Sequence, residues 1–215
     1  MNIKDAKIAK EGFIYIIALA LLAWVIAILG FKLISLIIAF TTLFAIYFFR
    51  DPDRIIPSDP YAVIAPADGE VMEIENSKEG DFLAKEMRRI SIFLSLTDCH
   101  INRAPLTGTV RGKKYNKGRF SLAYLTMASN ENERLSTLIE SEDGEKIVVV
   151  QIAGYLARRI VSYITDGSFI NRGERIGMIR FGSRVDTFLP LHCEIITRVG
   201  DKVRGGETII GWLRG

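Results

Sequence analysis

Two long apolar runs dominate the first fifty residues of the chain. Residues 13–30 contain no charged side chain, and neither do residues 33–49. Each run has about the 20 apolar residues that a helix needs to cross a bilayer. The only charged residue between the runs is Lys32, which follows Gly30 and Phe31. The pattern predicts an N-terminal transmembrane helical hairpin within residues 1–50.

Cationic side chains flank both ends of this hairpin: Lys4, Lys7, Lys10, Arg50 and Arg54. Positive flanks favour the cytoplasmic side, so both ends of the hairpin are expected there. A cleaved signal peptide is the alternative, but it has one short apolar core followed by small residues. Here a second apolar run follows at once. We therefore expect a protein of the cell membrane, with residues 51–215 on the cytoplasmic side. Whether the hairpin spans the bilayer or is re-entrant stays open.

Beyond residue 50 the pattern changes to short segments rich in β-branched residues, separated by turn signals such as Asp-Gly. This rhythm predicts a mainly β domain with few short helices. Residues 123–138 lack the rhythm and are expected to form a loop or a short helix. The expected strands are Ala62–Ile64, Gly69–Ile74, Ile90–Leu94, Gly108–Val110, Lys146–Ile152 and Arg159–Ile164.

One eight-residue unit, Gly-x-x-apolar-x-x-Gly-Glu, occurs at residues 167–174 and again 33 residues later at 200–207. Such an internal repeat suggests two similar β-hairpin halves packed together. The arrangement resembles the barrel-sandwich hybrid of lipoyl and biotinyl carrier domains. A carrier presents a modified lysine between its halves, whereas residues 183–190 contain none. Carrier function is therefore disfavoured, although a membrane-tethered, carrier-like β domain remains an alternative.

The formal net charge of +3 is modest, and the Lys and Arg residues are scattered. A nucleic-acid-binding protein would show a denser basic stripe, so no nucleic-acid partner is expected. Attraction to an anionic lipid surface or an ordinary solvated surface explains the basic clusters equally well. The two cysteines, Cys99 and Cys193, give neither a disulfide framework nor metal-ligand spacing, and they fit a reduced compartment.

The bond between Gly182 and Ser183 carries candidate chemistry of an unusual kind. A serine hydroxyl can attack the preceding carbonyl, and glycine has no side chain to obstruct it. The amide becomes an ester, and elimination leaves dehydroalanine, which hydrolyses to a pyruvoyl group at a new N-terminus. That group is an electron sink of the kind that amino-acid decarboxylation needs. Because Gly-Ser is also a common turn, the dipeptide alone decides nothing.

Asp68 and His100 are the candidates for assisting groups. Asp68 is part of an Asp-Gly pair, which by itself indicates a hairpin turn. His100 is one of only two histidines, and proton transfer near neutral pH most often uses histidine, although a lone histidine is more often simply packed. The other, His192, lies in an alternating segment where we expect a core or edge role.

Ser183, His100 and Asp68 could form the triad of a serine hydrolase if the fold brings them together. The nucleophile elbow Gly-x-Ser-x-Gly is absent around Ser183, however. The same three groups could instead activate the hydroxyl against its own upstream carbonyl. A zinc peptidase is disfavoured, because two histidines 92 residues apart do not supply its ligands, and no metal is expected.

Several ordered segments together resemble the phosphatidylserine decarboxylase family, in the short membrane-anchored form of bacteria and archaea. The match extends from the hairpin almost to the C-terminus. Its segments are residues 48–52 (Phe-Phe-Arg-Asp-Pro), 66–69 (Pro-Ala-Asp-Gly), 100–105 (His-Ile-Asn-Arg-Ala-Pro), 132–134 (Asn-Glu-Arg), 151–159 (Gln-Ile-Ala-Gly-Tyr-Leu-Ala-Arg-Arg) and 180–186 (Arg-Phe-Gly-Ser-Arg-Val-Asp).

The resemblance implies a proenzyme that cuts itself between Gly182 and Ser183. Residues 1–182 would become the β chain and residues 183–215 the α chain. Ser183 would become the pyruvoyl cofactor, which forms a Schiff base with the substrate amine. By the same resemblance Asp68 and His100 accompany the serine, no metal or pyridoxal phosphate is needed, and the reaction converts phosphatidylserine to phosphatidylethanolamine in phospholipid biosynthesis.

Two points stay open within this resemblance. Longer relatives carry a second histidine three residues after the first, where this chain has Arg103, so His100 could serve both self-cleavage and proton return. The sequence does not single out Arg184 or another cation as the group that holds the substrate's anionic head. Archaetidylserine, with an ether-linked tail, is an alternative substrate, and a homodimer is compatible with the family.

Overall fold

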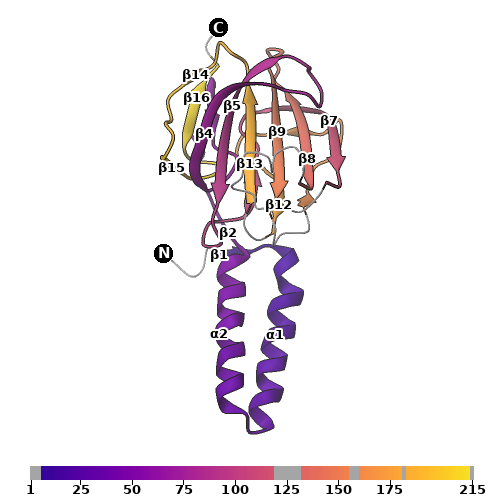
Figure 1. The fold of residues 1–215 in the computed structure, drawn as a ribbon, viewed down its shortest axis with the longest axis vertical. Coiled ribbons are helices and arrows are strands. Elements are labelled where there is room, and N and C mark those ends of the chain that lie inside the picture. The colour runs from indigo at the N-terminus through magenta and orange to yellow at the C-terminus, as the bar shows by residue number, and fades with distance from the viewer. Residues whose placement is uncertain (1–5, 119–131, 155–159, 181–182, 214–215) are drawn as a thin grey trace. The chain divides into compact units, whose positions relative to one another are not determined.

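The computed structural model describes residues 6–118, 132–154, 160–180 and 183–213. The chain divides into two compact units, Met1–Asp53 and Arg54–Gly215, called here the helical unit and the β unit. Figure 1 shows the elements of both units.

The helical unit is a hairpin of α1 (Lys10–Ile28) and α2 (Lys32–Phe48), with strand β1 (Ala6–Ile8) paired antiparallel to β2 (Arg50–Pro52). The predicted pair of apolar helices is therefore confirmed. By length and composition α1 could cross a membrane, while α2 is shorter, at 17 residues. Helix α1 begins in close contact with the end of α2: a Cβ added to Gly12 would lie 2.5 Å from the Phe49 side chain.

The β unit is built on one curled eight-stranded sheet of order β11-β7-β8-β9-β13-β5-β4-β15 (Figure 1). Two three-stranded sheets, β10-β12-β6 and β14-β16-β3, accompany it. The mainly β prediction is confirmed. The strands are β3 (Ala62–Ile64), β4 (Gly69–Lys78), β5 (Glu86–Leu94), β6 (Ile101–Arg103), β7 (Gly108–Asn116), β8 (Arg134–Glu140), β9 (Lys146–Ala153), β10 (Ile160–Ser162), β11 (Phe169–Ile170), β12 (Arg175–Ile179), β13 (Ser183–Leu189), β14 (Glu194–Ile195), β15 (Lys202–Val203) and β16 (Ile209–Trp212).

All six segments expected to be strands contain strands, most of them longer than expected. The expectation of a loop or short helix over residues 123–138 is wrong where the structure describes it, because β8 begins at Arg134. Its sequence Arg-Leu-Ser-Thr-Leu-Ile-Glu places polar Ser136 and Thr137 at buried positions between neighbouring strands, which hides the alternation. Residues 123–131 of that segment lie outside the described residues.

The order of the strands in the large sheet is symmetrical about its middle, between β9 and β13. Half A contains β3, β4, β5, β13, β14, β15 and β16, and half B contains β6, β7, β8, β9, β10, β11 and β12. The pair β4–β5 of half A and the pair β7–β8 of half B share a register: Ala65–Val71 matches Ala104–Val110, and a β-bulge follows at the same point in each.

The glycine repeat predicted from the sequence forms the same turn in both halves. Gly206 N donates to Ala65 O at 2.9 Å, and Gly173 N donates to Ala104 O at 2.8 Å. Both glycines adopt a positive φ, of 87° and 81°, which favours glycine. The repeat is thus a short strand followed by a turn, with β15 in half A and β11 in half B.

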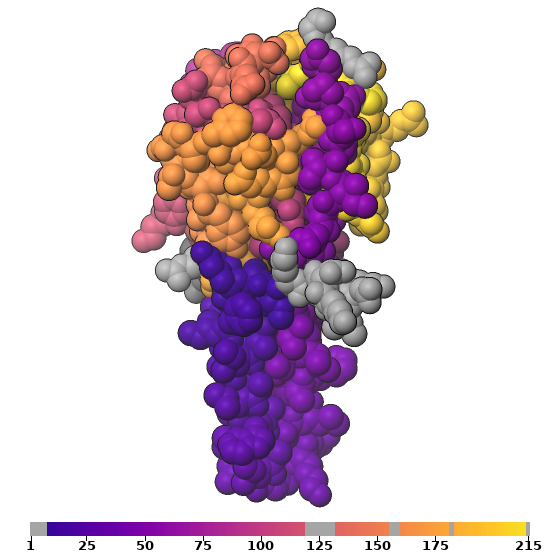
Figure 2. Space-filling model, turned by 180° about the vertical axis from the view of Figure 1, so that it is seen from behind, coloured from indigo at the N-terminus to yellow at the C-terminus, as the bar shows by residue number. Residues whose placement is uncertain are grey.

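Residues 54–61 run along the outside of the β unit, as the violet band in Figure 2 shows. We call this segment the strap. Glu207 Oε1 accepts a hydrogen bond from Ile55 N at 3.1 Å, and Arg172 donates to Pro57 O at 2.6 Å. The strap is therefore held by both copies of the repeated turn.

Apolar side chains cover both faces of the large sheet. The main core, which includes Val71, Ile92, Ile147 and Val185, fills the inner face. A second cluster, including Met87, Val148 and Phe188, lies on the opposite face. Because side chains alternate along a strand, the odd-numbered residues of β13 face the main core and the even-numbered ones face away.

Candidate functional site

Ser183 is the first residue of β13. This strand lies at the middle of the large sheet and belongs to half A. Ser183 is fully buried between Leu94 of β5 and Ala153 of β9. Its Oγ has no hydrogen-bond partner among the described residues. A buried hydroxyl without a partner costs free energy, so a role for it is expected. Gly182, the other half of the predicted cleavage site, lies outside the described residues.

Asp68 lies just before β4, whose first residues pair with the end of β5 next to Leu94. One carboxylate oxygen accepts a hydrogen bond from Gly205 N at 2.8 Å, and the other from Arg54 Nη2 at 2.8 Å. The two side chains are largely buried, with 16% of Asp68 and 7% of Arg54 exposed. Asp68 is thus a fixed carboxylate, not only a turn residue.

Arg54 is a residue that the sequence analysis missed as part of the site, because it counted only as a flanking cation. Burial alone lowers the pKa of its guanidinium, but the charge and hydrogen bond of Asp68 outweigh this, and the pKa lies above its ordinary value. Glu207 Oε2 lies 3.7 Å away and adds to the effect. Arg54 therefore stays charged beside Asp68 throughout the physiological range.

His100 is fully buried directly before β6. Its Nδ1 lies 3.0 Å from Asp98 O, and its carbonyl accepts a hydrogen bond from Ile179 N at 3.3 Å. Because a carbonyl can only accept, Nδ1 carries the proton of the neutral ring and Nε2 is the basic nitrogen. The ring therefore has the tautomer that a general base needs.

Strand register brings these elements to one end of the sheet. Ser183 pairs with Leu94, and Glu70, two residues after Asp68, pairs with Phe93. His100 is linked by its carbonyl to Ile179, four residues before Ser183. The three candidate residues thus lie on segments that meet at the same end of β5 and β13.

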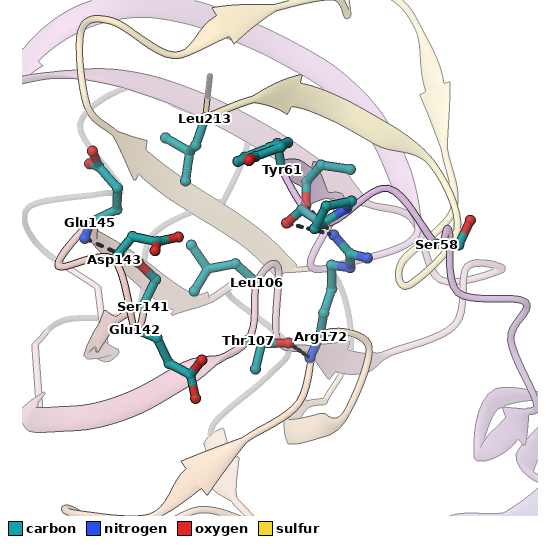
Figure 3. A pocket seen from close by; sticks show the side chains of 12 residues that line it. Ser58, Tyr61, Leu106, Thr107, Ser141, Glu142, Asp143, Glu145, Arg172 and Leu213 are labelled. Carbon is teal, nitrogen blue, oxygen red and sulfur yellow. Dashed lines mark hydrogen bonds between the residues drawn. The ribbon is translucent and has the colours of Figure 1, made fainter. Parts of the chain in front are cut away.

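The pseudo-symmetry gives a second argument for this convergence. Counting from matched registers, Ser183, Asp68 and His100 of the candidate site correspond to Glu145, Thr107 and Tyr61. Those three counterparts all line one cavity of about 1060 Å³, shown in Figure 3. Side chains at these positions therefore surround one space at the start of β9, which supports the same arrangement at the start of β13.

Amides form a polar layer beside Ser183. Gln151, which pairs in register with Val185, donates through Nε2 to Asn102 Oδ1 at 2.7 Å. Asn132 Nδ2 donates to Ala153 O, directly opposite Ser183, at 2.8 Å. All three amides are buried. Their segments were recognised from the sequence, but no signal there assigned them to the site.

The structure corrects the role expected for His192. His192 lies in a turn before β14 rather than in an alternating strand, is 51% exposed in its side chain, and contacts Glu145 at 3.2 Å. The alternation around it arises from the turn residues Leu191 and Cys193. Arg103 is buried and donates to Gly173 O at 3.0 Å.

Both cysteines are buried and unbridged. Burial raises the pKa of the Cys193 thiol to about 12, and the nearby Glu145 carboxylate adds to the shift. Such a thiol is not a nucleophile at neutral pH. Within the described part of the chain, no group of three or more His, Cys, Asp or Glu side chains is arranged to hold a metal ion.

Most cations of the basic cluster at residues 111–117 contact other groups of the protein. Arg111 pairs with Glu140, Lys114 lies 2.9 Å from Asp81, and Lys113 donates to Ile164 O at 2.5 Å. Of the two interpretations left open by the sequence, the structure favours an ordinary protein surface here.

Comparison with known proteins gives a consistent result. The family model described as Phosphatidylserine decarboxylase matches residues 41–211. The protein named "Phosphatidylserine decarboxylase proenzyme" of Geobacter metallireducens is 44% identical over 218 residues, covering 99% of this chain and all of the relative. Proteins of the same name from Rickettsia akari (45% over 206 residues, 94% of this chain and 89% of the relative) and Syntrophus aciditrophicus (39% over 208 residues, 96% and 98%) are similar as well.

Proposed function

The chain belongs to the phosphatidylserine decarboxylase family, and we propose that it converts phosphatidylserine to phosphatidylethanolamine with a pyruvoyl group made from its own Ser183. The observation that carries the proposal is the buried Ser183 hydroxyl, without a partner among the described residues, in a chain whose relatives are named proenzymes.

Self-cleavage starts at Ser183. His100, through Nε2, takes the hydroxyl proton while Oγ attacks the Gly182 carbonyl, and Asp68 supports the charge that develops on the histidine. The C–N bond breaks and an ester forms, with the proton passing to the freed amine. Elimination then releases the Gly182 carboxylate and leaves dehydroalanine, which takes up water and loses ammonia. The products are a β chain of residues 1–182 and an α chain of residues 183–215.

The residues present fit the pyruvoyl group. It would be made from the atoms of Ser183, so the site between Leu94 and Ala153 needs no additional space. When present, the group supplies a conjugated carbonyl that accepts the electron pair released as carbon dioxide leaves. His100, buried at the same end of the sheet, is the residue that we assign to return a proton to the substrate's α-carbon.

The helical unit is the membrane anchor in this proposal. Helix α1 carries exposed apolar side chains such as Trp24 and Ile28, as a lipid-facing helix does. The β unit is placed at the cytoplasmic face of the cell membrane, because cations flank the hairpin. The anchor allows a two-chain lipid to reach the site without leaving the bilayer. The chemistry selects the phosphoserine head, so ester-linked and ether-linked lipids, including archaetidylserine, are both candidates.

Intact mass spectrometry of the protein in detergent tests the proposal, with Ser183→Ala as the matched control. Two fragments divided between Gly182 and Ser183 are expected, the lighter about 17 Da below its serine-bearing mass because ammonia is lost. The control should stay whole. Processed protein should release carbon dioxide from phosphatidylserine vesicles. A wild-type chain that stays whole after prolonged incubation with lipid would contradict the proposal and leave the tethered β domain as the better explanation.

A further inference from the structure

Arg184, directly after Ser183, is the largest of the fully buried side chains among the residues that the structure describes. Its Nε donates to Asp186 Oδ1 at 2.5 Å. Its Nη2 donates to Ser91 Oγ at 2.7 Å and lies 3.2 Å from Glu73 Oε2. A buried guanidinium is tolerated only when charged or polar partners surround it, and these three provide them.

These contacts lie on the side of the sheet that faces away from Ser183. Val185 and Leu189 of β13 belong to the main core, and Phe188 belongs to the cluster on the opposite face. Alternation therefore places the Ser183 side chain on the core face and the Arg184 side chain on the other. The guanidinium is committed to protein groups there, so it is a poor candidate for holding the substrate's phosphate or carboxylate.

The partners of Arg184 divide unequally between the two chains of the processed protein. Ser91 and Glu73 belong to residues 1–182, whereas Asp186 belongs to residues 183–215, as Arg184 does. Glu73 is itself held by Arg89 Nη2 at 2.9 Å. Once the backbone is cut, the contacts to Ser91 and Glu73 become contacts between chains, one residue from the new terminus.

A new chain terminus normally frays, because its first residue loses the covalent neighbour that fixed it. The processed site needs the opposite, since a misplacement of about 1 Å at a reacting group can lower a rate by about a hundredfold. Pairing of β13 with β5 and β9 retains the fragment as a whole. The buried charge of Arg184 fixes the residue next to the reacting group.

We propose that Arg184 is a positioning residue that anchors the new N-terminus after cleavage, through Ser91 and Glu73 of the other chain. The inference rests on the proposed function, because it requires cleavage between Gly182 and Ser183. It assigns the residue a role that begins only once the chain is cut, because before cleavage the intact backbone holds the strand.

The primary variants are Ser91→Ala and Glu73→Gln, which remove an interchain partner and leave Arg184 in place. The matched control is Glu75→Gln, because Glu75 contacts Arg89 at 2.5 Å and does not contact Arg184 in the described structure. Arg184→Met removes the cation and Arg184→Lys replaces it with a shorter one. The pair shows whether a shorter cation preserves the function of Arg184. Each substitution is made in the self-cleaving chain and in the uncut Ser183→Ala chain.

The first readout is hydrogen–deuterium exchange of the amides of residues 184–188, which does not depend on activity. We expect Ser91→Ala and Glu73→Gln to speed exchange in the cut chain by about tenfold or more, with little change in the uncut chain. Glu75→Gln should change neither. Equal acceleration in cut and uncut chains would show a purely structural role and overturn the inference.

The second readout is steady-state decarboxylation of phosphatidylserine in mixed micelles. Self-cleavage by the primary variants should go to completion, kcat should fall by about tenfold, and KM should change by less than about twofold. An increase in KM with kcat unchanged would instead assign the Arg184 network to substrate binding and overturn the anchor. Wild-type protein that does not cut itself would refute the proposed function, whereas normal cleavage and unchanged kcat in both primary variants would refute this inference alone.

Discussion

The two halves of the β unit share a backbone but not a chemistry. In half A, Gly205 N donates to the Asp68 carboxylate at 2.8 Å; in half B, the matching Arg172 N donates to the Thr107 hydroxyl at 3.0 Å. The turn and its side-chain cap are the same, but only half A has a charge there. The repeated fold therefore supplies the cap, and a single substitution makes it a catalytic candidate.

The residues at the start of β13 and at the start of β9 also differ in their chemistry. Ser183 of half A corresponds to Glu145 of half B, which lies in the short turn joining β8 to β9. The Arg172 side chain in half B donates to Pro57 O of the strap and to Ala62 O of β3. Around the start of β9 the cavity is lined by Glu145, Thr107 and the strap residue Tyr61, at the positions that correspond to Ser183, Asp68 and His100 (Figure 3). The comparison shows that matching backbone positions are not sufficient for the proposed reaction, which also requires the side chains of Ser183, Asp68 and His100.

The outer face of the sheet shows the contrast once more. Around β13 it carries Arg184, Asp186 and Ser91, whereas around β9 it carries Val148, Val150 and Ile152. A cavity of about 390 Å³ borders this charged region and is lined by residues including Asp81, Arg89 and Asp186. Charge is concentrated behind the strand that begins at the expected cleavage site.

The strongest way to break the comparison is to give half A the side chain of half B. Asp68→Thr keeps an acceptor for Gly205 N but removes the charge. We expect self-cleavage to slow by about a hundredfold or more, because Asp68 supports the charge on His100, and positioned proton transfer contributes about that factor. The reciprocal Thr107→Asp should leave the rate unchanged. A time course of fragment formation measures both, and normal cleavage by Asp68→Thr would remove Asp68 from the site.

Removal of the cation beside Asp68 should have the next largest effect. Arg54→Gln leaves a largely buried carboxylate without its charged partner, and we expect a loss of about 2–3 kcal/mol in the free energy of unfolding. Denaturant unfolding of the uncut Ser183→Ala chain measures it. The exposed Arg204, which lies 3.8 Å from the same Glu207, provides the matched control, and Arg204→Gln should be neutral. Equal effects of the two variants would contradict the pairing described for Arg54.

The matched glycines offer a finer comparison. An added Cβ would lie 2.8 Å from Arg103 Cδ at Gly206 and 2.2 Å from Ile56 Cδ1 at Gly173. Because both glycines have a positive φ, each Gly→Ala change should lower the free energy of unfolding by about 1–2 kcal/mol. The melting temperature should fall accordingly. Only Gly206→Ala should also slow self-cleavage, since Arg54 lies beside it. Equal cleavage rates in the two variants would show that the strap does not transmit this strain to Asp68.

The smallest expected effect concerns how the free energy of unfolding falls at acidic pH. Burial by itself raises the pKa of Asp81, but hydrogen bonds from Ser136 and Lys114 outweigh it and hold that pKa below its usual range. A carboxyl whose pKa is lowered by folding stabilises the protein above its unfolded pKa, and this stabilisation is lost as the pH falls through the folded value. Asp81→Asn should therefore reduce stability at pH 7 and flatten its decline below about pH 4. An unchanged slope between pH 5 and 3 would contradict the assignment.

Several features of the fold were readable from the sequence because they are local. The apolar runs, the strands at Ala62–Ile64 and Lys146–Ile152, and the 33-residue repeat all follow from periodicity and turn residues. A second repeat was present as well, since Ala65–Val71 and Ala104–Val110 share Ala, Pro, Gly and Val at matching positions. The symmetrical order of the sheet was not readable, because pairing of β9 with β13 joins distant segments whose alternation allows several registers.

The site shows the same limit. Ser183, Asp68 and His100 were found because their residue types suggest chemistry, and the convergence of their segments is a property of the fold. Arg54 was missed because its partner Asp68 lies 14 positions away, beyond the strap and β3, and a cation after a hydrophobic helix is explained well enough by membrane topology. The commitment of Arg184 to the outer face could not be predicted, since it depends on which face of β13 meets the main core.

The place of β13 in the middle of the sheet has a consequence for how the active protein could be made. It is paired on both sides, with β5 and with β9, and the residues that follow it reach the sheet edge at β15 and a second sheet at β14 and β16. A fragment of residues 183–215 interleaved in this way has to be folded before it is separated. Cut protein that is fully denatured should therefore refold slowly and with a dependence on concentration, whereas the uncut Ser183→Ala chain should refold as one molecule. The uncut precursor is therefore the form in which all strands of the fold belong to one chain and can fold together.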